Sequence, residues 1–396
     1  MRRLLLRTVP QTGGELIRKE RLFRLGQIGN RQRSGTDRKS TRKDRDKTTI
    51  MEKKDMKSMY LSELQQEFAA LGQPKFRAGQ VFDWLHAKQV TEFTMMTNLP
   101  KALREELAAS YAIPSVTVED RLISQIDGTE KYLLALPDGN AVEAVLMTYD
   151  YGKSLCVSSQ VGCRMGCAFC ASTLHGLVRN LSAAEMLDEV YRVQSLADGR
   201  IDHVVIMGCG EPLDNYDNVV RFIRLLSDPH GHNMSVRHIT VSTCGLAPRI
   251  LNLAGEDLPV MLALSLHAPN DEIRRTLMPV TKRYALPEVL SACDAYFAAT
   301  GRRVSYEYCL IDGVNDTDGH AEELARLLAG KNCHVNLIPM NPVEERAHLR
   351  ETRGREQAFK NKLEKLGINA TIRKKMGRDI AGACGQLRNS RLEREG

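Results

Sequence analysis

Three closely spaced cysteines are the part of this sequence best suited to inorganic chemistry. Cys163, Cys167 and Cys170 have the spacing C-x3-C-x2-C directly after a predicted strand. Iron–sulfur clusters take their ligands mainly from cysteine thiolates, and a cubane needs four. Three ligands from one loop would leave one iron open to bind and reduce a small molecule. The alternative is a zinc site, which usually takes paired C-x2-C units and a fourth ligand, for which Cys156 and His175 are the nearest candidates.

Phe169, just before the third cysteine, completes the pattern by which the sequence resembles the radical S-adenosylmethionine (SAM) enzymes. Further motifs at residues 158–163, 208–212, 265–270 and 383–387 narrow the resemblance. Together they look like the dual-specificity adenine C2 methyltransferases of rRNA and tRNA (RlmN type). The resemblance runs from about residue 56 to residue 387. The related Cfr-type enzymes, which methylate C8 of adenine, are the alternative within the same chemistry.

The resemblance implies a [4Fe-4S] cluster on Cys163, Cys167 and Cys170, and SAM, two molecules of which are used in each turnover. The cofactor then carries the radical chemistry while the protein orients it. By resemblance, Gly210 and Glu211 hold the methionine amino end of SAM. The ribose and adenine of SAM are lined by Ser242, Ser265, Leu266, His267 and Asn341. The remaining cysteines are interpreted as structural: Cys209, Cys244, Cys293, Cys309 and Cys333.

Three further residues take catalytic roles by resemblance. The family cysteine that matches Cys384 is methylated by one SAM and then gives a hydrogen atom to the radical made from a second SAM. The methylene radical adds to the electron-poor C2 carbon of adenine, which accepts an alkyl radical but not a methyl cation. Cys156 would release the protein–RNA adduct by forming a disulfide with Cys384, and Glu143 matches the proton acceptor. Taken alone, Cys156 and Glu143 have ordinary interpretations, as a buried strand cysteine and an outward-facing strand carboxylate.

The elements that position these residues are predicted from alternating apolar strands and amphipathic helices. Strands are expected near residues 155–158, 203–207, 237–242, 259–266, 303–310 and 333–339, with an extra strand near 369–375. The first connecting helix begins at Ser182, because Ser182 and Glu185 form a capping box. Six strand–helix repeats favour an α/β fold with a parallel sheet. The family fold is an incomplete (β/α)6 barrel, and the motifs follow the carboxyl ends of its strands, where barrel enzymes keep their chemistry.

The composition along the chain predicts five parts. Residues 1–50 are basic and low in aromatic residues, which predicts a flexible tail. The alternative is that the start codon has been assigned too early and that translation begins at Met51 or Met56. A helical module is expected over 51–112, and a β-meander with two hairpin turns at Asp127-Gly128 and Asp138-Gly139 over 113–150. The barrel follows over 151–376, and a C-terminal segment with Cys384 over 377–396.

The net charge of +7 is unevenly distributed. Residues 1–50 carry net +10 and residues 51–396 carry net −3, while residues 346–378 alone carry net +8. Such basic stretches indicate either phosphate contacts with nucleic acid or a solvated helix face. The family targets are an adenosine in the peptidyl-transferase centre of 23S rRNA and the adenosine 3′ of the anticodon in some tRNAs. The adenine must lie in a loop or be flipped out, because a base inside a duplex is unreachable.

The sequence also indicates the cellular compartment and the partners of the protein. No apolar run approaches the roughly 18 residues of a membrane span, and ten cysteines in a long enzyme-like chain fit a reducing compartment. A cytoplasmic monomer that receives electrons from a donor such as flavodoxin or ferredoxin is expected. Two other classes stay open: a radical SAM activase of a protein partner, and a non-catalytic zinc-bearing RNA-binding protein.

Overall fold

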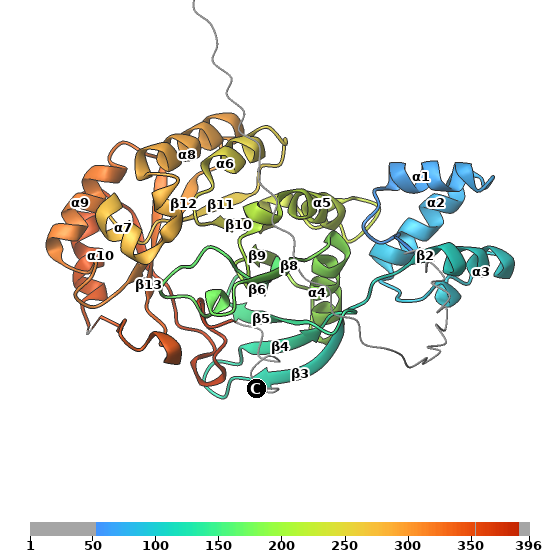
Figure 1. Cartoon of the computed structure of the whole chain (residues 1–396), viewed down its shortest axis with the longest axis horizontal. Helices are drawn as coiled ribbons and strands as arrows, with labels where there is room; N and C mark the ends of the chain where they lie inside the picture. Colours follow the sequence, from blue (N-terminus) through green and yellow to red (C-terminus); the bar gives the residue numbers. More distant parts are fainter. Residues whose placement is uncertain (1–52, 353, 388–396) are drawn as a thin grey trace, which may run out of the picture. The chain divides into compact units, whose positions relative to one another are not determined.

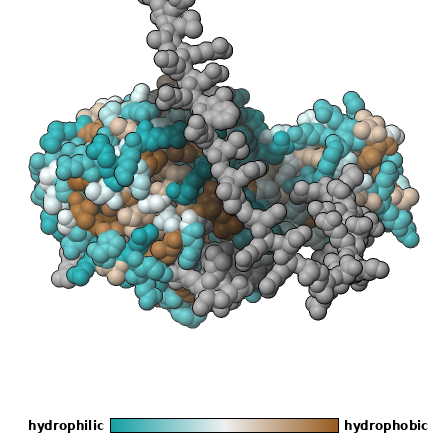
Figure 2. All heavy atoms as spheres, in the orientation of Figure 1, coloured by the Kyte–Doolittle hydropathy of each residue, from teal (hydrophilic) through white to brown (hydrophobic). Residues whose placement is uncertain are grey.

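The computed structural model describes residues 53–352 and 354–387. The predicted basic tail and Met51, the first of the two alternative start positions, lie outside the described residues, while the second, Met56, is buried in the core. Within the described ranges, no helix is long and apolar enough to cross a membrane. In the orientation of Figure 1, the visible surface of the described residues is mostly hydrophilic, with smaller hydrophobic areas between the hydrophilic ones (Figure 2).

The first described part of the chain, residues 54–112, is mainly helical and is called the helical module below. Its helices are α1 (Leu61–Ala70), α2 (Lys75–Phe82) and α3 (Lys101–Ser110), with a π-helical turn over Asp83–Ala87. Two short strands, β1 (Lys54–Asp55) and β2 (Tyr111–Ala112), pair in parallel at its two ends. Leu64, Phe68 and Val81 are buried, as their helical spacing predicts.

A meander of three antiparallel strands follows: β3 (Thr117–Ile123), β4 (Glu130–Ala135) and β5 (Ala141–Tyr149). Gly128 and Gly139 have φ values of 71° and 88°, a left-handed conformation that glycine adopts without steric cost. The two predicted hairpin turns are therefore confirmed. Strand β5 also pairs antiparallel with the next strand, β6, which joins the meander to the rest of the sheet.

Seven parallel strands continue this sheet in sequence order. They are β6 (Gly152–Val157), β9 (His203–Ile206), β10 (Ile239–Thr243), β11 (Met261–Ser265), β12 (Val304–Leu310), β13 (Cys333–Pro339) and β14 (Ala370–Ile372). Within the described residues, β14 and β3 are the two ends of a ten-stranded sheet and do not pair with each other. The six predicted barrel strands and the extra strand are all present, and the barrel is incomplete.

Helices connect the parallel strands and lie outside them (Figure 1). They are α4 (Ala183–Leu196), α5 (Tyr216–Ser227), α6 (Ala247–Ala254), α7 (Asp271–Leu277), α8 (Leu286–Thr300), α9 (Asp318–Leu328) and α10 (Glu356–Lys365). At the start of α4, the Glu185 N–H donates to the Ser182 hydroxyl (3.2 Å) and the Ser182 N–H donates to the Glu185 carboxylate (2.9 Å). The predicted capping box is confirmed. One continuous apolar core joins the helical module, the strands and the covering helices.

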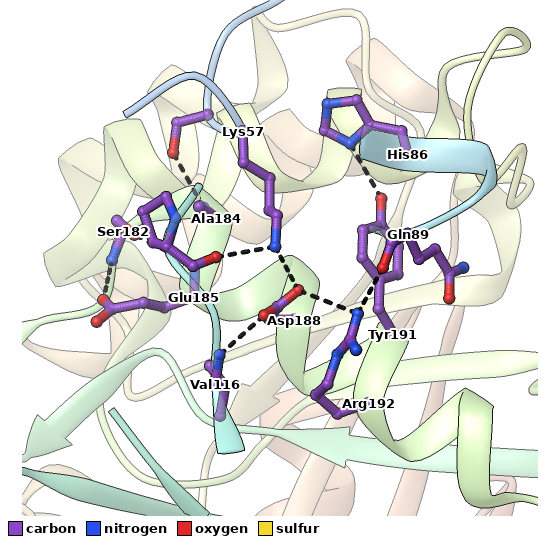
Figure 3. Close-up of polar contacts among 12 residues, drawn as sticks. Lys57, His86, Gln89, Val116, Ser182, Ala184, Glu185, Asp188, Tyr191 and Arg192 are labelled. Carbon is purple, nitrogen blue, oxygen red and sulfur yellow. Dashed lines mark hydrogen bonds and ion pairs between the residues drawn. The ribbon is translucent and has the colours of Figure 1, made fainter. Parts of the chain in front are cut away.

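A buried polar network fixes the helical module to α4 (Figure 3). The Lys57 ammonium lies 2.7 Å from the Asp188 carboxylate, and both side chains are fully buried. Lys57 also donates to the Pro114 carbonyl (2.8 Å), and the Val116 N–H donates to the second Asp188 oxygen (2.8 Å). Arg192, one turn further along α4, donates to the Gln89 carbonyl (2.8 Å). Buried charges need such complete pairing, because an unpaired charge away from water is costly.

Candidate active site

The three clustered cysteines lie around one cavity. Their loop runs between β7 (Gln160–Gly162) and β8 (Leu177–Asn180), two short antiparallel strands. The Cys163 N–H donates to the Gly176 carbonyl (2.9 Å), which closes the base of the loop. A Cβ atom at Gly162 would lie 1.9 Å from that carbonyl oxygen, so only glycine fits. Cys163, Cys167 and Cys170 all line a cavity of about 150 Å³, called the first cavity below.

These cysteines fit an iron–sulfur cluster. Burial raises the pKa of all three thiols, that of Cys167 to about 12, so their ionisation requires a strong positive charge such as iron ions supply. Among residues 53–352 and 354–387, no three His, Cys, Asp or Glu side chains are arranged to hold a single metal ion. A cluster instead spreads its thiolates over separate irons. Of the candidates for a fourth ligand, His175 is exposed and Cys156 lines a different cavity.

The turn after β9 forms one wall of the first cavity. Gly210 has a φ of 109°, and a Cβ atom there would lie 2.7 Å from the Gln160 side chain. The Glu211 carboxylate accepts hydrogen bonds from the Cys244 N–H (2.7 Å) and the Leu213 N–H (3.1 Å). Burial raises the pKa of Glu211. Both Gly210 and Glu211 line the first cavity beside the cysteines.

The other predicted SAM contacts divide into two groups. Ser242, Ser265 and His267 line the first cavity from the carboxyl ends of β10 and β11. Leu266 does not line it, because its side chain packs in the apolar core and its N–H donates to the Glu307 carbonyl (3.0 Å). Asn341 lines a second cavity, and its side-chain amide donates to the Cys384 carbonyl (3.1 Å).

His267 is held in a specific, uncharged form. Its φ of 56° is unusual for a residue with a side chain. Its Nδ1 accepts the Cys309 N–H (2.9 Å), its carbonyl accepts the Asn315 amide (2.8 Å), and its ring meets the Phe169 ring edge-on at 4.7 Å. Burial lowers the pKa of His267 to about 3, so the imidazole is neutral near pH 7. Sequence reasoning missed Asn315, which follows β12 and fixes this conformation.

Cys384 connects the two cavities. The second cavity, of about 40 Å³, contains Cys156 on β6 and Cys384 in the C-terminal segment. Met207, Ile338, Arg373 and Cys384 line both cavities. Cys384 is exposed and Cys156 is buried. Residues 228 positions apart in sequence thus share one cavity, and one of them also borders the cavity of the three clustered cysteines.

Two sets of hydrogen bonds hold the segment around Cys384. Beyond the cysteine, the Ala171 N–H donates to the Gly385 carbonyl (2.8 Å) and the Ser172 hydroxyl donates to the Leu387 carbonyl (2.6 Å). Both donors directly follow the third clustered cysteine.

Before the cysteine, the segment binds the β3–β4 turn. The Asp379 carboxylate accepts the Ser124 hydroxyl (2.6 Å) and the Gln125 N–H (2.9 Å), while the Gly377 N–H donates to Asp127 (2.9 Å). The meander therefore serves as a support for the segment that carries Cys384.

Glu143 lies apart from both cavities. It is buried on β5 and lines neither the first nor the second cavity. The Lys131 ammonium lies 3.3 Å from its carboxylate and also donates to the Ala381 carbonyl (3.4 Å), three residues before Cys384. Its backbone carbonyl accepts the Ser158 hydroxyl (2.9 Å). Glu143 is thus linked to the C-terminal segment through Lys131.

Several cavity residues had been interpreted differently from sequence. Cys244 and Cys309, expected to be structural, line the first cavity. Cys209 is buried with its pKa raised to about 12, and lines neither cavity. Arg373 had counted only as part of a basic stretch. The predicted strand near residues 369–375 contained Arg373, whereas β14 ends at Ile372, so no sequence signal placed Arg373 at the rim of the cavities.

The fold and the cysteine loop together define a radical SAM enzyme. The family model described as "Radical SAM superfamily" matches residues 157–328, and the model described as "Ribosomal RNA large subunit methyltransferase N-terminal domain" matches residues 54–113. A solved radical SAM methyltransferase from Sphaerobacter thermophilus superposes with a TM-score of 0.80 at 44% identity, covering 85% of this chain and 99% of that one.

Similar proteins narrow the class. The chain is 58% identical over 342 residues to a protein of Lachnoclostridium phytofermentans named "Probable dual-specificity RNA methyltransferase RlmN", covering 86% of this chain and 96% of that protein. A protein of the same name from Alkaliphilus oremlandii is 50% identical over 343 residues, covering 87% and 100%. The chain belongs to the RlmN family of radical SAM RNA methyltransferases. The predicted family is confirmed, and the family implies a [4Fe-4S] cluster and SAM.

Proposed function

We propose that the protein methylates C2 of an adenosine in 23S rRNA and of the adenosine 3′ of the anticodon in some tRNAs. The methyl group is first carried by Cys384, and the transient protein–RNA adduct is resolved by a Cys384–Cys156 disulfide. One observation supports this most directly: Cys384 borders both the cavity of the clustered cysteines and the cavity that contains Cys156. A residue that receives a group at one place and delivers it at another must reach both.

The roles of the chain's own residues follow from their positions. The cluster, when bound to Cys163, Cys167 and Cys170, supplies the electron that cleaves SAM. Gly210, Glu211, Ser242, Ser265 and His267 orient SAM in the first cavity. Two molecules of SAM are used in each turnover, one for the methyl group and one for the radical. Asn341, which is predicted to contact SAM, also donates a hydrogen bond to the Cys384 carbonyl and so helps to hold the methyl-carrying residue.

Glu143 is proposed to accept the C2 proton of adenine. It does not border either cavity in this arrangement, and Lys131 links its carboxylate to the segment before Cys384. Movement of that segment as it delivers the methyl group would pull on Lys131 and change its contact with Glu143. The Glu143→Gln variant should therefore retain methylation of Cys384 and lose transfer to RNA.

RNA contact is proposed for the basic residues at the second cavity rather than for α10. On α10, Lys360 pairs with Glu364 (2.7 Å) and Lys362 pairs with Glu322 on α9 (2.6 Å), so their charges are already neutralised. Lys374 lines the second cavity instead, whereas Arg373 in the same cavity contacts Glu307 and the Cys384 sulfur. Phosphate neutralisation by lysine and arginine is the main source of RNA affinity, and it weakens as salt increases.

Anaerobic turnover tests the proposed function. The protein is reconstituted with iron and sulfide and incubated with SAM, a reductant and an unmodified 23S rRNA fragment, and the nucleosides are analysed by mass spectrometry against standards. 2-Methyladenosine is expected. 8-Methyladenosine would assign the Cfr-type reaction instead, and neither product alongside SAM cleavage would reject the substrate. The Cys384→Ala variant should retain its iron content and SAM binding but make no methylated adenosine, whereas the matched Cys333→Ala variant, remote from both cavities, should remain active.

A further inference from the structure

Arg373 occupies the boundary between the two cavities. It directly follows β14, and it lines both the first and the second cavity. Its Nη1 atom lies 3.8 Å from the Cys384 sulfur and 3.7 Å from the Met207 sulfur. The same nitrogen lies 3.6 Å from the Glu307 carboxylate. One guanidinium group therefore touches the sulfur that would carry the methyl group and an acidic side chain of the SAM cavity.

The charge of Arg373 bears directly on the chemistry of Cys384. A thiolate is the nucleophilic form of cysteine, and a neighbouring cation favours it. The neighbouring Cys384 sulfur is the largest cause of a raised pKa at Arg373, and the guanidinium stays protonated. Two more cationic residues, Lys374 and Lys375, line the second cavity. Lys375 forms an ion pair with Glu351, whereas Arg373 donates a hydrogen bond to the Cys384 sulfur.

Glu307 offers Arg373 a second anionic partner. It is buried on β12 and lines the first cavity. Its Oε1 accepts the Asn336 amide (2.8 Å), whereas its buried Oε2, the atom that faces Arg373, accepts no hydrogen bond from the described part of the chain. A buried carboxylate oxygen without a hydrogen bond is stabilised when a cation moves closer to it. Arg373 can thus shift toward Glu307 when the sulfur of Cys384 becomes neutral.

We propose that Arg373 is a catalytic residue of the first step, the transfer of a methyl group from SAM to Cys384. Arg373 holds Cys384 as a thiolate for this step and moves toward Glu307 once Cys384 carries the methyl group. The inference rests on the proposed role of Cys384 as methyl carrier. The Cys384 thiol loses its proton to solvent, and its electron pair forms the new S–CH3 bond as the bond from the methyl group to the sulfonium of SAM breaks. S-adenosylhomocysteine leaves, and Arg373 keeps its proton throughout. The loss of negative charge on Cys384 releases the guanidinium, so the methylated cysteine is free to move toward RNA.

Alkylation of Cys384 tests this role without RNA turnover. The full-length protein, reconstituted and held anaerobic at pH 7, is treated with iodoacetamide, a neutral reagent whose approach does not depend on Arg373 charge. The Cys384 peptide is quantified by mass spectrometry over time, peptides that already carry a methyl group are counted separately, and Cys333 in the same sample is the reference. The Arg373→Met variant should alkylate Cys384 about tenfold more slowly, because the guanidinium that contacts the sulfur in the wild type stabilises the reactive thiolate.

Three further variants distinguish the contact of Arg373 with the Cys384 sulfur from a general effect of charge in the cavity. Arg373→Lys should recover part of the rate, and it also serves if Arg373→Met does not fold. Lys374→Met removes a charge from the same cavity without a sulfur contact and should leave the rate unchanged. Glu307→Gln removes the competing partner and should keep the rate at or above that of the wild type. An unchanged rate in Arg373→Met, or an equal loss in Lys374→Met or Glu307→Gln, would overturn the proposal.

A labelling experiment keeps this inference distinct from the proposed function. Wild-type protein is incubated with SAM that carries a deuterated methyl group, without RNA. Label on Cys384 in the wild type supports the carrier role, and a slower gain of label in Arg373→Met supports the role of Arg373. If the wild type takes up no label, the carrier role itself fails. If both proteins gain label at the same rate, the carrier role stands and the role of Arg373 is rejected.

Discussion

At the scale of single residues, Cys156 offers the sharpest test of the adduct mechanism. It is buried in the second cavity on β6, and the exposed Cys384 borders the same cavity. If Cys156 resolves the adduct, the Cys156→Ala variant should still join covalently to RNA but fail to release it. We expect a species that resists denaturation on a gel and contains both protein and RNA, and that is absent from Cys156→Ala/Cys384→Ala. Normal release of methylated RNA by the single variant would contradict the disulfide step.

His86 gives a prediction for acid stability at the same scale. It is fully buried beside Tyr191, and burial lowers its pKa to about 3, whereas an unfolded histidine has a pKa of about 6.5. Below about pH 6.5 the unfolded chain therefore binds a proton that the folded chain does not. Stability from this group is present near pH 7 and falls by about 2 kcal/mol between pH 7 and pH 5.

The His86→Gln variant should remove that part of the acid sensitivity. Denaturant unfolding at pH 7 and pH 5, under anaerobic conditions, measures the difference for the wild type and the variant. The matched control is His230→Gln, because His230 is exposed and should leave the pH dependence unchanged. An equal loss of stability in the wild type and in His86→Gln would reject His86 as a source of acid sensitivity.

At the scale of elements, the β3–β4 turn should control how well Cys384 is placed. Asp379 accepts two hydrogen bonds from that turn, at 2.6 and 2.9 Å. The Asp379→Asn variant loses the charge that strengthens both bonds, so the segment over residues 377–385 should exchange its amide hydrogens faster. We expect a lower kcat with a nearly unchanged iron content, and the exposed Asp217→Asn on α5 is the control. Unchanged exchange in the segment would show that the turn does not hold it.

The elements were predictable from sequence to the extent that local pattern determines them. The parallel strands follow from short apolar runs, and the start of α4 follows from the Ser182–Glu185 capping box, which needs only four neighbouring residues. The second cavity was not predictable, because it forms only when the segment around Cys384 folds back onto strands more than two hundred residues earlier. Such contacts leave no periodic signal in either segment.

Individual side chains show the same limit. Leu266 and His267 are neighbours in one motif, yet one packs in the core and the other lines the first cavity. Both residues lie beyond the end of β11 at Ser265, and the left-handed φ of His267 (56°) redirects the backbone between them, so periodicity along the motif does not tell which side chain enters the site. Arg373 was visible only as one of eleven basic residues until the fold placed it at the Cys384 sulfur. Counting charges along the sequence indicates a basic surface. The contact that one guanidinium makes depends on the tertiary structure.

At the scale of the whole molecule, the Lys57–Asp188 pair should decide whether the helical module stays attached to the barrel. Both side chains are fully buried, and the pair joins the first described segment to α4 (Figure 3). The Lys57→Met variant leaves the Asp188 carboxylate with a backbone N–H and with Arg192 at 3.9 Å. Removing one partner of a buried pair costs about 3–5 kcal/mol, and we expect the lower end because Arg192 partly compensates.

Denaturant unfolding of matched variants measures that cost. Lys54→Met, which breaks the exposed pair with Glu67, should cost less than about 1 kcal/mol. The double variant Lys57→Met/Asp188→Leu removes both charges and should recover most of the stability, because the penalty arises from the lone buried carboxylate rather than from the lost attraction. A cost for Lys57→Met as small as that for Lys54→Met would mean that the apolar core alone holds the module in place. A double variant as unstable as the single one would mean that the hydrogen bonds of Lys57 to Pro114 and of Asp188 to Val116, rather than charge balance, fix this junction.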